Sequence, residues 1–114
     1  MVRQRLDSVF AALADPTRRR MLERLARGPM SIGQMAKGFS ISQPGISKHV
    51  KILECAGLLK REIVGRVHEC RLEPATLQGV SSWLDRQERF WSATLDRLDS
   101  YFTDSSSAKR KNRS

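Results

Sequence analysis

The chain has 114 residues, of which 39% are hydrophobic and 29% charged, which suits one folded domain and excludes wholesale disorder. Lysine and arginine outnumber aspartate and glutamate by nine, and the four basic residues after residue 108 leave +5 on residues 1–108. Such a charge favours polyanionic partners, because each neutralised phosphate releases condensed counterions. No apolar run reaches the length of a membrane span, and the first residues lack the apolar stretch of a signal peptide. We therefore expect a cytoplasmic protein with no membrane partner.

Two helices are expected at the start of the chain. Apolar residues recur at intervals of three and four over residues 3–14, which predicts an amphipathic helix. Asp15-Pro16 is typical of an N-cap followed by a proline in the first helical turn. The second helix should then run to about residue 27, where Gly28-Pro29 ends it.

A helix-turn-helix is expected next. Ser31 and Gln34 have the spacing of a capping box, which opens a short helix. After a turn at Gly38, Ser42 caps a further helix, expected over residues 42–56. Two helices joined by a short glycine-bearing turn are typical of proteins that insert the second helix into the DNA major groove.

Beyond residue 57 the apolar period changes from that of a helix to that of a strand. Two short alternating runs flank Gly65-Arg66, which predicts a β-hairpin over residues 59–72. From Pro74 a long amphipathic helix is expected up to residue 102, with more apolar surface than one small core can cover. Residues 1–102 should form a DNA-binding and dimerisation domain, and residues 103–114 a disordered basic tail.

The helix over residues 42–56 has the polar face of a recognition helix. At about 100° per residue, Ile46, Val50 and Leu53 fall on a narrow apolar stripe, while Gln43 and Ser47 face away from it. Glutamine can pair with adenine in the major groove, and lysine and arginine suit phosphates. A solvated surface would show the same face, but the basic hairpin beside it favours a DNA-binding wing. The predicted DNA contacts are Ser42, Gln43, Ser47, Lys48, His49, Lys51, Arg61 and Arg66.

The chain resembles the ArsR/SmtB family of bacterial winged-helix repressors over about residues 5–102. The most specific stretches are Leu13-Ala14-Asp15-Pro16-Thr17-Arg18 and Ser42-Gln43-Pro44-Gly45-Ile46-Ser47-Lys48-His49. The resemblance implies a fold that is mainly α with a β-hairpin, in the order α-α-α-α-β-β-α. It also implies a homodimer joined by the first and last helices on a pseudo-palindromic, double-stranded operator. The expected dimer interface comprises Leu6, Val9, Phe10, Trp83, Leu84, Phe90, Trp91, Leu95, Leu98 and Phe102.

The metal sites that the resemblance would imply are missing their ligands. The thiolate site of the family would place cysteines near Ser31 and Gly33, and neither residue is a cysteine. The site on the last helix needs histidines, and none follows His68. The chain is similar to the subgroup without metal ligands, which implies a metal-independent repressor, with autorepression as one form of it. We expect no metal and no cofactor, and the sequence identifies no effector.

The two cysteines leave an alternative open. Cys55 and Cys70 could act as a thiol switch, with Cys55 off the apolar stripe near Lys51. Both cysteines together with the two histidines could also hold a metal, but the histidines have ready roles near DNA. Two ordinary small residues in a reducing compartment explain the pair more simply.

Functions of other classes are less well supported. The chain has no nucleophile elbow, phosphate loop or dinucleotide fingerprint, so an enzyme is not expected. The long last helix could instead dock a different protein, in which case the purified chain would be monomeric. RNA binding is disfavoured, because RNA readers usually stack bases on aromatic residues of sheets or loops.

Overall fold

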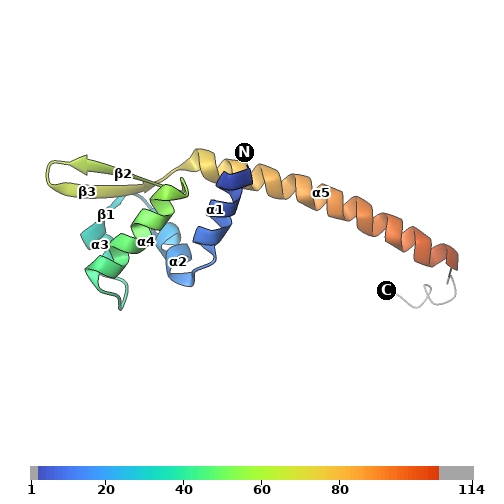
Figure 1. Ribbon diagram of the computed structural model, residues 1–114, viewed down its shortest axis with the longest axis horizontal. Coiled ribbons are helices and arrows are strands. Elements are labelled where there is room, and N and C mark those ends of the chain that lie inside the picture. Colours follow the sequence, from blue (N-terminus) through green and yellow to red (C-terminus); the bar gives the residue numbers. More distant parts are fainter. Residues whose placement is uncertain (1–2, 106–114) are drawn as a thin grey trace. The chain divides into compact units, whose positions relative to one another are not determined.

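The computed structural model describes residues 3–105, and these divide after Val80 into two compact units (Figure 1). The elements in chain order are α1 (Arg3–Leu13), α2 (Pro16–Leu25), β1 (Met30–Ser31), α3 (Ile32–Ala36), α4 (Gln43–Cys55), β2 (Leu59–Val64), β3 (Val67–Leu72) and α5 (Pro74–Ser105). The expected order of helices and hairpin is therefore confirmed, with one short strand added.

The first unit has a continuous hydrophobic core to which α1, α2, α3, α4, the sheet and the start of α5 all contribute. The apolar stripe of α4 lies in it, with Ile46, Val50 and Leu53 each 0% exposed. Val9 is also 0% exposed, which corrects its assignment to a dimer interface, because a side chain enclosed by its own core has no surface left for a partner. The remaining buried residues are Ala12, Met21, Leu22, Leu25, Met35, Ala56, Leu58, Leu59, Cys70 and Val80.

Helices α2 and α3 begin next to the capping residues that the sequence predicts. The Asp15 carboxylate accepts hydrogen bonds from the amides of Thr17 and Arg18 at 2.7 and 3.1 Å, as an N-cap should. The hydrogen bond from the backbone amide of Arg18 is the main reason that the pKa of the Asp15 carboxyl lies below its usual range. Ser31 and Gln34 form both halves of the predicted capping box.

Arginines close the helix ends of the first unit. Arg18 donates through Nε to the Ala12 carbonyl at 2.7 Å, and Arg19 donates to the Leu13 carbonyl at 2.7 Å. These carbonyls belong to the last turn of α1 and have no partner within the helix. Arg24 donates in the same way to the Met35 carbonyl of α3, also at 2.7 Å. From the sequence alone, Arg18, Arg19 and Arg20 could face solvent or pair with Glu23. In the structure, Arg18 and Arg19 both donate to carbonyl groups of α1.

The sheet has three antiparallel strands in the order β1-β3-β2. Strand β1, which was not predicted, pairs Met30 with Cys70 and Ser31 with Glu69 of β3. A strand of two residues shows no alternation, so the sequence carries no signal for it. The hairpin is as predicted, with Val64 opposite Val67 across a two-residue turn. Gly65 has φ of 65° at the first turn position, which is typical of a type II′ turn.

The second unit begins at Ser81 and consists, within the described residues, of the rest of α5. Its exposed large apolar residues are Leu84, Phe90, Trp91, Leu95, Leu98, Tyr101 and Phe102. Phe90 packs edge-on against Trp91, with ring centroids 5.4 Å apart. Helix α5 continues through Ser105, so residues 103–105 are helical where a tail was expected. The rest of the predicted tail, residues 106–114, lies outside the described residues.

Candidate nucleic-acid interface

Helix α4 turns a polar side away from the core, as the sequence predicted. Gln43, Lys48 and Lys51 are exposed, and Ser47 is half-buried. Ser42 serves mainly as the N-cap, since its hydroxyl accepts the Gly45 amide at 3.2 Å. The helix ends at Cys55, and two residues later Gly57 has φ of 78°, the left-handed conformation that lets the chain turn into β2.

Helix α4 and the β2–β3 hairpin, which is the predicted wing, line a mainly polar groove of about 470 Å³. Its lining residues are Ser31, Ile32, Gly33, Gln43, Ser47, Arg61, Arg66, Val67 and His68. Four of the predicted DNA contacts therefore meet at one place, from segments well separated in the sequence. The start of α3 also lines this groove, although it was not among the predicted contacts. Pairing of β1 with β3 brings it there, and a strand of two residues leaves no pattern in the sequence from which to predict that pairing.

Within the wing, acidic residues pair with two of the basic ones. Arg61 contacts Glu54 of α4 at 2.8 Å and is about one quarter exposed. Arg71 lies 3.0 Å from Glu69 and 3.8 Å from Glu62. Arg61 is predicted from the sequence to contact DNA, whereas in the structure its guanidinium already pairs with Glu54.

Arg66 differs from the paired arginines because it occupies the turn of the hairpin. Its side chain is exposed, and among residues 3–105 no hydrogen bond or ion pair to it is found. An exposed guanidinium at the end of a two-stranded ribbon suits a phosphate or the minor groove. Of the two predicted wing contacts, Arg66 is therefore the more available.

His49 lies at the margin of the apolar stripe, as its helical angle predicted. It is half-buried, and Arg18 Nη1 lies 3.2 Å from its Nδ1. The same guanidinium holds the end of α1 and lies 3.9 Å from Asp15. The contact ties α4 to α2, so Nδ1 of His49 is engaged inside the protein rather than presented to a base.

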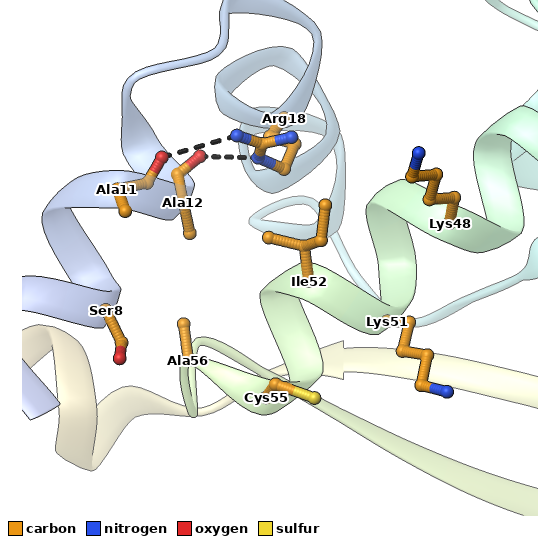
Figure 2. Close-up of a pocket in the computed structure, with 9 residues that line it drawn as sticks. All are labelled: Ser8, Ala11, Ala12, Arg18, Lys48, Lys51, Ile52, Cys55 and Ala56. Atoms are coloured by element: carbon orange, nitrogen blue, oxygen red, sulfur yellow. Dashed lines mark hydrogen bonds between the residues drawn. The ribbon is translucent and has the colours of Figure 1, made fainter.

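Lys48 and Lys51 do not line the wing groove. They stand at the rim of a second hollow, between α1 and α4 (Figure 2). Helix α4 thus carries base-reading candidates toward the wing and phosphate-binding candidates toward α1.

The two cysteines have different surroundings. Cys55 is exposed at the end of α4, whereas Cys70 is buried in the sheet opposite Arg61. Burial raises the pKa of the Cys70 thiol, which lowers the fraction of reactive thiolate. A switch that needs both thiols is therefore poorly supported.

Among residues 3–105, no group of three or more histidine, cysteine, aspartate or glutamate side chains is placed to hold a metal ion. Over the same residues, none of the helices has the length and apolar character to traverse a bilayer.

Comparison with known proteins gives consistent matches. A helix-turn-helix domain family matches residues 13–62. The HTH-type transcriptional regulator Rv2034 of Mycobacterium tuberculosis is 38% identical, over 78% of this chain and 80% of that protein. The transcriptional repressor SdpR of Bacillus subtilis is 37% identical, over 69% of this chain and 88% of its own length. Among solved structures, an ArsR-like transcriptional regulator from Rhodococcus sp. RHA1 superposes with a TM-score of 0.77 at 33% identity, covering 86% of this chain and 92% of that one.

Proposed function

The chain belongs to the ArsR/SmtB family of winged helix-turn-helix transcriptional repressors, and from that premise we propose that it is a metal-independent, homodimeric repressor. Its relatives and its fold are those of DNA-binding regulators and not of enzymes. The groove that brings Gln43, Ser47 and Arg66 together is the observation that carries the proposed mode of DNA binding.

In the proposed complex, α4 enters the major groove and the hairpin follows the backbone. Gln43 and Ser47 face base edges, where glutamine makes paired hydrogen bonds to adenine. Lys48, Lys51 and Arg66 bind phosphates, which position the protein without reading sequence. Arg61 supports this arrangement by joining the wing to the end of α4 through Glu54.

The exposed apolar face of α5 supports a homodimer. Leu84, Trp91, Leu95, Leu98 and Phe102 follow intervals of seven, four, three and four, which place them along one side of a helix. Such a continuous apolar face on a soluble protein marks an interaction site. A two-fold pairing would set two recognition helices about one DNA turn, ~34 Å, apart on a pseudo-palindrome. Repression would follow because a dimer bound over a promoter excludes the polymerase.

We propose metal independence because the residues at the expected metal site lack suitable ligand atoms. The positions of the thiolate site are Ser31 and Gly33, and neither side chain supplies a soft ligand. Ser31 is moreover occupied as a helix cap.

The test is binding of the purified chain to the DNA upstream of its own gene and to a scrambled duplex, over a salt series, with and without EDTA. Selective binding to the upstream DNA that EDTA leaves unchanged is the expected result, and it would also support autorepression. Loss of selective binding in EDTA would exclude metal independence. Selective binding elsewhere in the genome but not upstream would exclude autorepression while leaving the repressor in place.

A further inference from the structure

The hollow between α1 and α4 has the size and lining of a small-molecule site. Its volume is about 550 Å³, within the usual range of ligand pockets. Ala12 and Ala56 are buried beneath it, while Ala11 and Ile52 border it (Figure 2). The remaining lining residues are Ser8, Arg18, Lys48, Lys51 and Cys55. Most of its surface is therefore aliphatic, in contrast to the polar groove beside the wing.

The charged side chains around this hollow all have the same sign. Three of its lining residues are cationic and none is acidic. Arg18 is occupied, because it donates to the carbonyls of Ala11 and Ala12. Lys48 and Lys51 have no hydrogen-bond or ion-pair partner among residues 3–105. Their ammonium groups extend outward from the rim in Figure 2, so unpaired positive charge stands at the mouth of an apolar hollow.

We propose that this hollow binds a small amphipathic carboxylate and that such a ligand weakens DNA binding. The apolar chain of the ligand lies against Ala12, Ile52 and Ala56, and its carboxylate lies at the mouth between Lys48 and Lys51. Lysine stems are flexible enough to bring their ammonium groups over an apolar surface. An inorganic anion would leave the aliphatic lining exposed to water, and a neutral lipid would leave the lysines without a counterion.

The effect on DNA rests on the proposed function, because it uses the same two lysines. A bound carboxylate neutralises charges that otherwise meet phosphates, so ligand and DNA compete. We expect saturating ligand to weaken DNA binding about 10-fold, within the range typical of coupled sites. Thermodynamic reciprocity requires DNA to weaken ligand binding by the same factor. The salt dependence of DNA binding should also become shallower, by about 0.9 in the log–log slope for each lysine neutralised.

The experiment uses decanoate as the probe and Cys55 as the reporter. Cys55 lines the hollow and is exposed, whereas Cys70 is buried, so a bulky maleimide should react with the folded full-length chain at Cys55 alone. Decanoate below its micelle concentration should slow this reaction about 10-fold at saturation, by covering the thiol. Decanol, which has the same chain without the charge, should slow it far less.

Two variants within the hollow and one control outside it locate the effect. Ala11→Leu fills the hollow from its open edge and should abolish protection by decanoate while leaving DNA binding in its absence unchanged. Ala26→Leu, an equal change at an exposed position outside the hollow, should behave as the unmodified chain. Ile52→Asn should also abolish protection, because it makes the wall of the hollow polar. This second variant keeps the test informative if Ala11→Leu fails to fold.

The outcomes separate this proposal from the one on which it rests. The maleimide experiment is done without DNA and tests only the ligand site. The DNA titration without decanoate tests only DNA binding, so either proposal can fail while the other stands. Unchanged labelling in decanoate, or equal protection by decanol, would overturn the ligand class. Protection that grows with protein concentration in the absence of decanoate would show that a second copy of the chain covers the hollow, which would also overturn it.

Discussion

The two units of this chain handle their apolar residues in opposite ways. Up to Val80 most of the large apolar side chains of the helices meet in a single core, with Met21, Met35 and Leu53 fully enclosed; Phe10 and Ile52 are exceptions. From Ser81 onward the described part of α5 carries leucines and aromatics that stay about half exposed, such as Trp91 and Leu95. The first unit completes its packing with its own residues, while the second presents a surface that a partner would complete.

The largest effect is expected in the first unit. Leu53→Ala should lower the free energy of unfolding by about 2–5 kcal/mol, because it removes a fully buried side chain and leaves a cavity. Urea unfolding followed by circular dichroism measures it. The matched exposed change Ile63→Ala should cost less than about 0.5 kcal/mol. Similar losses of unfolding free energy for the two variants would contradict the assignment of Leu53 to the enclosed core.

A smaller effect of a different kind is expected in the second unit. Trp91→Ala should raise the dimer dissociation constant by about 30-fold or more, the equivalent of about 2 kcal/mol, because buried aromatic residues dominate interfaces. Sedimentation equilibrium over a concentration series measures this, with Ser92→Ala as the neighbouring control. A wild-type chain that remains monomeric would instead favour a docking helix for another protein.

Within the first unit, substitutions on α4 should distinguish sequence-specific from non-specific DNA binding. Gln43→Ala should cost about 1–3 kcal/mol on the cognate site and much less on scrambled DNA, because paired hydrogen bonds to a base depend on sequence. Fluorescence anisotropy with both duplexes measures the difference. Gln78→Ala, at an exposed position early in α5, is the control. Equal losses on both duplexes would show that Gln43 does not read sequence.

Lys51→Ala should weaken binding to both duplexes alike. It should also reduce the slope of log affinity against log salt by about 0.9, because one fewer phosphate is neutralised. Lys37→Ala, an exposed lysine just after α3, should leave the slope unchanged. A loss confined to the cognate site would place Lys51 on a base edge instead.

The smallest effect concerns the start of α2. The folded chain holds the pKa of Asp15 below its usual value, so the ionised cap stabilises the fold above that value and loses its effect as the pH falls through the lowered pKa. Asp15→Asn keeps a capping oxygen without the charge. The stability difference between the two chains should therefore shrink on acidification, as measured by thermal unfolding at several pH values. A difference independent of pH would assign the cap to hydrogen bonding alone.

Most of the fold could be predicted because local signals agree with one another. Asp15-Pro16, the Ser31 capping box, Ser42 and the Gly65-Arg66 turn each mark an element boundary, and the structure has a boundary at each of them. Periodicity could not reveal β1, since two residues define no period, nor the end of α5, since a polar last turn resembles a tail.

The candidate site was predictable in its residue types but not in its partners. Helical angles placed Gln43 and Ser47 on the polar side of α4, and the structure agrees. The pairs of Arg61 with Glu54 and of His49 with Arg18 join distant segments, so only the folded chain brings them together. Val9 failed as an interface residue for a related reason, because an amphipathic helix shows which side is apolar but not whether its own core or a partner covers it.

The arginines that bind carbonyl groups at helix ends contribute to the net positive charge of this chain, but their role is structural. Arg18, Arg19 and Arg24 each donate a hydrogen bond to a carbonyl group of a neighbouring helix. They therefore join helices to one another, and the fold holds their guanidinium groups in place. Exchanging them for lysine would conserve every charge and still remove the planar, multiply donating group that does this work. The chain therefore has arginines of two kinds: Arg66 presents an exposed charge at the end of the hairpin, whereas Arg18, Arg19 and Arg24 have a structural role that requires the guanidinium itself.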